Sequence, residues 1–66
     1  MNGAVVEFDD DKGWGTVRDD ASGDELFFHC TAIADGTRTI EVGTPVAYEI
    51  VAGHRGRWEA AALQNR

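Results

Sequence analysis

The sequence predicts an all-β protein in which five short antiparallel strands close into a small barrel. Apolar and polar residues alternate with the period of two that a half-buried strand requires. Turn-forming residues interrupt this alternation at short, regular intervals, as in small sandwiches and barrels. The chain has only 66 residues, so it has room for one small core. We therefore expect residues 1–66 to form a single domain.

The first half of the chain contains three predicted strands separated by two acidic turns. The strands are Gly3–Phe8, Gly13–Arg18 and Glu25–Cys30, and the turns are Asp9–Lys12 and Asp19–Asp24. Two glycines in the second strand, Gly13 and Gly15, allow a close backbone approach or the strong bend of a small barrel.

The second half begins with a long connection, Thr31–Gly43, which has room for one helical turn at Thr31–Ala34. Pro45–Val51 is the fourth predicted strand, with Val46, Tyr48 and Ile50 on one side. Ala52–Gly56 is the last turn, and Arg57–Leu63 closes the sheet. The run of three alanines in that segment favours helix by propensity. Seven residues after a glycine turn are nevertheless too few for a stable isolated helix.

Alternation assigns the side chains of the second and third strands to two faces. Leu26 and Phe28 suit a core, together with Val17 on the preceding strand. Trp14 and Phe27 then lie on the opposite, outer face. The run Leu26–Phe28 is also compatible with a strand that is buried on both faces.

His29 shares the outer face with Phe27. An outward cluster of rings beside Lys12 is typical of a platform on which unstacked bases bind. His29 could stack on a base or donate to its edge, although a lone histidine is more often a hydrogen-bonded structural residue. We interpret Lys12 as a phosphate contact; a solvated turn residue is the alternative.

Several further residues have two possible interpretations. Strict alternation groups Phe8 with Ala4 and Val6, and a bulge would reverse its direction. Arg38, Arg55 and Arg57 could pair with phosphates or stack on bases, or could simply be solvated. Cys30 is expected to be a small hydrophobe on the inner face of its strand. Trp58 is expected to pack against the end of the barrel; the alternative is an additional exposed ring.

The order of these segments resembles the cold-shock domain family, whose members are five-stranded OB-fold barrels that bind single-stranded RNA and DNA. Lys12–Val17 is similar to the KGFGFI-like strand of that family, and Leu26–His29 to its VFVH-like strand. The other similar segments follow in the same order over nearly the whole chain: Gly3–Asp9, Thr31–Ile33, Gly36–Ile40 and Val42–Ile50.

The sequence departs from the family pattern at four positions that are often aromatic. They hold Glu7, Thr16, Cys30 and Thr37. The remaining candidates for base stacking are Phe8, Trp14, Phe27 and His29. Since each stacked ring contributes roughly 1–3 kcal/mol, we expect weaker binding than with a full aromatic set.

The net charge of −6 is unusual for a nucleic-acid binder. It comes from residues 1–30, where eight acids face two cations; residues 31–66 are balanced, with four of each. Many of the acids lie in predicted turns, where carboxylates keep a small domain soluble.

Other classes of function lack their motifs. The single cysteine excludes an internal disulfide. We find no zinc or calcium spacing, no nucleophile–histidine pair and no phosphate loop, so we expect neither a metal, a cofactor, a small-molecule substrate nor catalysis. No apolar run approaches the ~20 residues of a membrane span, and the start lacks a secretory pattern. We therefore expect a cytoplasmic monomer.

Together these features predict non-catalytic binding of single-stranded RNA or DNA, with low sequence specificity. The predicted contacts are Phe8, Lys12, Trp14, Phe27, His29, Arg38 and Arg55. The resemblance implies a role as an RNA chaperone or in the regulation of gene expression. The alternative is a barrel of the same family that has lost most of this affinity and serves as a protein-interaction module.

Overall fold

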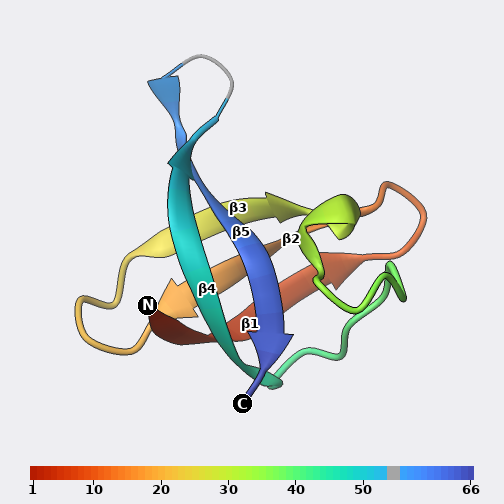
Figure 1. The fold of residues 1–66 in the computed structure, drawn as a ribbon, viewed down its shortest axis with the longest axis horizontal. Helices are drawn as coiled ribbons and strands as arrows, with labels where there is room; N and C mark the ends of the chain where they lie inside the picture. The colour runs from red at the N-terminus through yellow and green to blue at the C-terminus, as the bar shows by residue number, and fades with distance from the viewer. Residues whose placement is uncertain (54–55) are drawn as a thin grey trace.

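The structure is a computed structural model that describes residues 1–53 and 56–66, and it confirms the predicted all-β barrel (Figure 1). Every predicted strand is present, with bounds that shift by one or two residues. The elements are β1 (Asn2–Asp9), β2 (Trp14–Asp19), β3 (Glu25–His29), the 3-10 helix η1 (Cys30–Ala32), β4 (Pro45–Ala52) and β5 (Trp58–Asn65).

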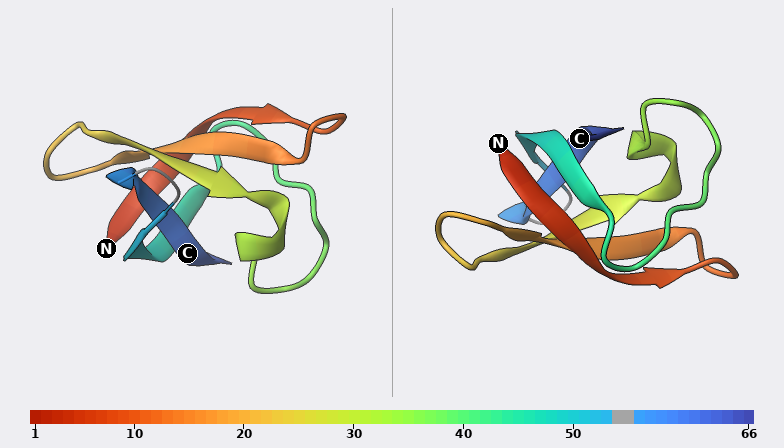
Figure 2. Two further views of the ribbon diagram at one scale, coloured as in Figure 1. Left: turned by 90° about the horizontal axis from the view of Figure 1, so that it is seen from above. Right: turned by 90° about the horizontal axis from the view of Figure 1, so that it is seen from below.

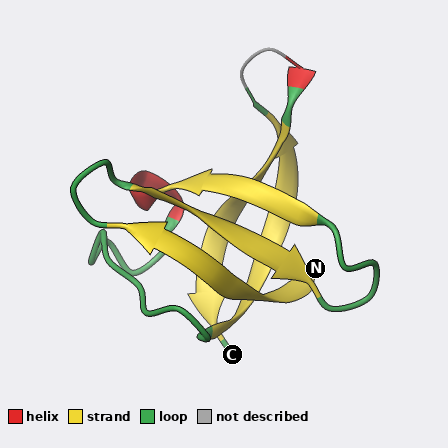
Figure 3. Ribbon diagram, turned by 180° about the vertical axis from the view of Figure 1, so that it is seen from behind, coloured by secondary structure: helices red, strands yellow, loops and turns green. Residues whose placement is uncertain are grey.

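The strands close in the order β1-β2-β3-β5-β4. Figure 3 shows β1, β2 and β3 as one curved sheet, with β4 and β5 crossing behind it. Four of the pairings are antiparallel, whereas β3 and β5 pair in parallel through Phe27 and Glu59. This short parallel contact closes the barrel and places the start of β5 beside the middle of β3.

The core lies between the β1–β2–β3 sheet and the β4–β5 hairpin. The expected inward residues Val17, Leu26 and Phe28 are all buried. The other buried apolar residues are Val5, Ile33, Val46, Tyr48, Ala60 and Leu63. Fully burying a large apolar side chain contributes roughly 1.5–3 kcal/mol, so this single cluster is the main source of stability.

A bulge in β1 settles the direction of Phe8. The register advances from Val5↔Val17 to Glu7↔Thr16, so Val6 is an extra residue in β1. Beyond the bulge Glu7 is exposed, and Phe8 turns toward the core. The Phe8 ring stacks on Phe28, with ring centroids 5.9 Å apart and planes 11° apart. Phe8 is therefore half-buried and is not a member of the outer aromatic face.

Gly15 makes this packing possible. It lies opposite Phe8, and a Cβ at this position would overlap the Glu7 carbonyl oxygen and lie 2.8 Å from Cζ of Phe28. This confirms the expectation of a close approach in β2. Cys30 is not in a strand as expected; it begins η1 and is half-buried. A Cβ on Gly13 would lie 3.2 Å from the Cys30 sulfur, so the thiol packs beside the first turn.

The far end of the β4–β5 hairpin extends beyond the barrel (Figure 1). Val46 and Tyr48 are buried as expected, but Ile50 is 40% exposed because the hairpin has left the core at that point. The register between the strands shifts between Ala47 and Glu49. The extra residue lies in β5, where Ala62 has a φ of 54°.

The connection between η1 and β4 bows outward at one end of the barrel (Figure 2). Ile33 and Ile40 anchor it to the core. Between them Asp35 accepts hydrogen bonds from the backbone N–H and the hydroxyl of Thr37, which lower the pKa of its carboxyl. Within residues 1–53 and 56–66, the structure has no helix of the length and apolar character needed to cross a membrane.

A buried hydrogen bond joins the last residue of β2 to β4. Asp19 is only 4% exposed and accepts hydrogen bonds from the Tyr48 hydroxyl and from the backbone N–H groups of Ala21 and Ser22. These bonds lower the pKa of Asp19, the Tyr48 bond most of all. Burial, and then the bond to Asp19, raise the pKa of Tyr48.

Candidate nucleic-acid interface

The outer face of β2 and β3 carries three rings in mutual contact. The centroids of Trp14 and Phe27 lie 5.7 Å apart, and those of Phe27 and His29 lie 4.9 Å apart. Trp14 is 42% exposed, while Phe27 and His29 are half-buried. This aromatic platform, formed by Trp14, Phe27 and His29, is the cluster that the alternation pattern predicts.

The strand register explains the arrangement of the platform. One row of side chains crosses the sheet as Asp9, Trp14 and His29, because Trp14 pairs with both of the others. The next row on the same face is Glu7, Thr16 and Phe27. Residues directly opposite one another on a face have neighbouring Cβ atoms. The three rings therefore occupy half of a six-residue surface.

A shallow groove, here called the platform groove, runs along this surface between β1 and the rings. It is lined by Glu7, Phe8, Trp14, Thr16, Phe27 and Val42, among others. Phe8 borders the groove although its ring stacks on the core. The groove is thus apolar toward β2 and β3 and acidic toward β1.

Lys12 lies at the edge of the platform. Its ammonium nitrogen lies 5.8 Å from the centroid of the Trp14 ring, within the range of a cation–π contact. Asp9 fixes the turn that carries Lys12, because its carboxylate accepts hydrogen bonds from the backbone N–H groups of Asp11 and Lys12. The sequence therefore positions one positive charge at the edge of the platform.

The arginines differ in whether they form ion pairs. Among residues 1–53 and 56–66, ion pairs join Arg18 to Glu25 at 2.8 Å and Arg66 to Asp20 at 3.0 Å. Arg38, on the exposed connection after η1, forms no ion pair within that part of the chain, and its φ is 62°. The predicted contact Arg55 lies outside the described residues.

The prediction that Trp58 packs against the end of the barrel is wrong. Trp58 is 64% exposed, the largest exposed fraction among the large hydrophobic residues in the described part of the chain. It stands at the start of β5, next to exposed Arg57. The sequence analysis considered Arg57 as a phosphate contact and Trp58 as an additional exposed ring, but included neither among the predicted contacts. An Arg-Trp pair directly after a glycine turn is a signal that could have included them.

Comparisons with known proteins show the family. A family model described as the 'Cold-shock' DNA-binding domain matches residues 1–65. Cold shock protein CspD of Bacillus subtilis is 45% identical over 57 residues, which cover 85% of each chain. Cold shock protein CspB of Bacillus caldolyticus is 42% identical over 57 residues, again 85% of each chain. Cold shock-like protein CspD of Bacillus cereus is 39% identical over 66 residues, 98% of each chain.

Proposed function

The chain belongs to the cold-shock domain family, and we propose that it binds single-stranded nucleic acid without catalysis and with little sequence preference. The observation that supports this most strongly is the contact among Trp14, Phe27 and His29 on an outer face. A solvated strand gains nothing from rings at three neighbouring positions of its outer face. Unpaired bases can stack on them, because every base has a π-face.

In the proposed complex, successive bases stack on Trp14, Phe27 and His29. Lys12 holds a phosphate at the edge of the platform, and Arg38 and Arg55 contact the backbone from the loops. Phe8 forms part of the apolar border of the groove, because its ring is stacked on Phe28. All three rings come from one chain, so one copy is sufficient to form the site.

Low sequence preference follows from stacking as the main source of affinity. Stacking tolerates any base, whereas sequence is read by hydrogen bonds to base edges. RNA is the expected ligand in the cytoplasm, where single strands with transient pairing are abundant. Binding to unpaired segments would keep them from pairing, which is the basis of an RNA-chaperone or regulatory role.

The acidic side of the platform groove supports weak binding. Glu7 and Asp9 occupy the β1 ends of the two rows that contain the rings. Their carboxylates repel phosphates and offer no surface for stacking. The same two residues favour the second candidate function, a protein-interaction module that has lost most affinity for nucleic acid.

The test is a binding titration with labelled oligo-dT, oligo-U and a duplex of equal length. Fluorescence anisotropy measures binding at low and at moderate salt. The proposal predicts binding to both single strands, weaker binding at higher salt, and much weaker binding to the duplex. Absence of binding to either single strand at both salt concentrations would reject the proposal in favour of the protein-interaction module.

A further inference from the structure

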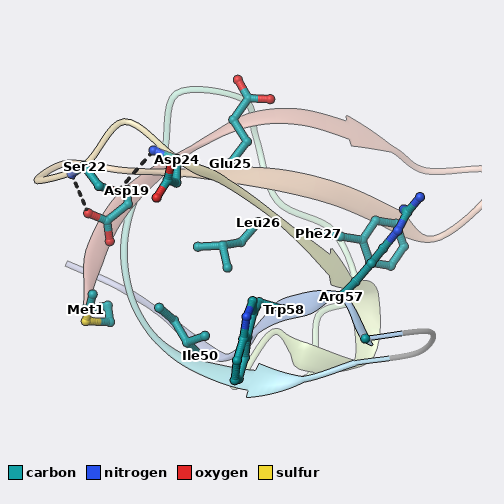
Figure 4. Close-up of a pocket in the computed structure, with 11 residues that line it drawn as sticks. Met1, Asp19, Ser22, Asp24, Glu25, Leu26, Phe27, Ile50, Arg57 and Trp58 are labelled. Carbon is teal, nitrogen blue, oxygen red and sulfur yellow. Dashed lines mark hydrogen bonds between the residues drawn. The ribbon is translucent and has the colours of Figure 1, made fainter.

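A second groove lies between β3 and the part of the β4–β5 hairpin that leaves the barrel. Figure 4 shows its lining, which includes Met1, Leu26, Phe27, Ile50, Arg57 and Trp58. We call it the tryptophan groove, because the indole of Trp58 stands over it from the start of β5. Neither the family resemblance nor the proposed function uses Trp58.

Phe27 connects the two grooves. It lines the platform groove together with Trp14 and the tryptophan groove together with Trp58. The start of β5 runs beside this part of β3, because Phe27 pairs with Glu59, the residue directly after Trp58. A strand bound at Phe27 therefore has the tryptophan groove directly beside it.

The charges differ between the two ends of the tryptophan groove. Arg57 and Phe27 lie at one end, and Asp24 and Glu25 lie toward the other (Figure 4). Within residues 1–53 and 56–66 Arg57 forms no ion pair, so its guanidinium is available for a phosphate. The carboxylates at the opposite end disfavour further phosphates. The groove thus suits a strand that enters past Phe27 and ends at Trp58.

We propose that Trp58 is an additional stacking site, which takes one nucleotide beyond the aromatic platform while Arg57 contacts its phosphate. This inference rests on the proposed function, since the strand reaches Trp58 from Phe27. An indole that is 64% exposed, beside a cation and next to a stacking residue, has the chemistry of a base-binding position. The occupant is therefore a nucleobase, and a peptide partner is the outcome that would contradict it.

The experiment uses the Trp14→Phe variant, which keeps a ring in the platform and leaves Trp58 as the only tryptophan. It is titrated with oligo-dT of about three nucleotides, one for each ring of the platform, and with longer oligo-dT of up to about eight, which lies within the roughly 4–16 nucleotides that one OB fold binds. Short oligonucleotides that occupy only the platform should leave Trp58 emission unchanged. Longer ones should quench it.

Affinity measurements complete the test. Trp58→Ala should weaken binding of the longer oligonucleotides by about 5- to 150-fold, the equivalent of one stacked base, and should leave the shortest unaffected. Trp58→Phe should retain most of the affinity, whereas Trp58→Leu, which keeps apolar area without a ring, should not. Val51→Ala, an exposed residue of the same hairpin, is the matched control and should bind as the parent does.

The outcomes separate the two proposals. If the parent binds single strands but Trp58 is never quenched, or if Trp58→Ala binds every length as the parent does, the inference is wrong and the proposed function stands. If Trp58→Leu binds as well as the parent, the contact is not stacking and the inference also fails. If the parent binds no single strand, the proposed function itself is wrong. A circular dichroism spectrum of each variant establishes that it is folded.

Discussion

The rings of Trp14 and Phe27 meet diagonally across β2 and β3, with centroids 5.7 Å apart and planes inclined by 55°. Neither residue is the direct partner of the other, since Trp14 pairs with His29 and Phe27 with Thr16. Because the two rings are tilted rather than stacked, neither covers a full face of the other. This relationship is the basis of the proposed binding mode.

Phe27 is the central ring of the platform, because it contacts both Trp14 and His29. Phe27→Ala should weaken binding to oligo-dT by roughly 1–3 kcal/mol, the contribution of one stacked base. Anisotropy titrations of parent and variant at one salt concentration measure the difference. Val51→Ala is the control, and an unchanged affinity of the Phe27 variant would show that this ring carries no base.

Two positions that are often aromatic in the family, Glu7 and Thr16 here, belong to one row of the sheet. Glu7 lies opposite Thr16, and Thr16 lies opposite Phe27, all on the outer face. In the double variant Glu7→Trp, Thr16→Phe, this row becomes aromatic across three strands. The variant should bind more tightly, by roughly 1–3 kcal/mol for each ring that stacks.

A second variant separates the ring from the charge. Glu7→Gln removes the carboxylate that repels phosphates without adding a surface for stacking, so its gain in affinity should be smaller. If the double variant binds no better than the parent, the missing rings do not limit affinity, and the stacking mechanism would be wrong even though the fold is correct.

Lys12 should account for a measurable part of the salt dependence. For single strands, a plot of log K against log salt has a slope of about −0.7 for each phosphate that the protein neutralises. Lys12→Gln should therefore make the slope of log K against log salt less negative by about 0.7. Arg66→Gln is the control, since Arg66 is paired with Asp20. Equal slopes for the parent and the Lys12 variant would exclude a phosphate contact at Lys12.

The Asp19–Tyr48 hydrogen bond makes stability depend on acid pH. The pKa of Asp19 is lower in the folded state than the ordinary value of about 3.9. As the pH falls, Asp19 therefore becomes protonated in the unfolded chain before it does so in the folded protein. The stabilisation is complete above about pH 5, roughly one unit above the unfolded pKa, and is lost as the pH falls through the folded pKa. Asp19→Asn should lower the urea midpoint at pH 7, and the difference from the parent should shrink in acid. A difference that stays constant down to about pH 2.5 would contradict this assignment.

Much of the fold could be predicted because it depends on local rules. Alternation in β2 and β3 identified the inward Val17 and Phe28 and the outward Trp14 and Phe27. Turn residues located the ends of the strands to within one or two residues. The features that differ from the prediction depend on contacts between distant segments, about which a period-two pattern holds no information.

Three residues illustrate this limit. Phe8 faces the core because a bulge at Val6 shifts the register of β1 against β2. Trp58 is exposed because the β4–β5 hairpin leaves the barrel, whereas its sequence neighbours suggest only a strand start. Ile50 continues the apolar alternation of β4 but passes the end of the core. In each case the outcome is set by how the strands meet, and not by the residues of one strand.

The most direct test of the central claim, that bases stack on the aromatic platform, is the emission of Trp14 alone. In the Trp58→Phe variant Trp14 is the only tryptophan, and it is 42% exposed beside Phe27. Titration with oligo-dT or oligo-U at low salt should quench its emission, added salt should reverse the effect, and a duplex should have little influence. Binding detected by anisotropy without any change in Trp14 emission, or no response to either oligonucleotide at low and moderate salt, would contradict the account.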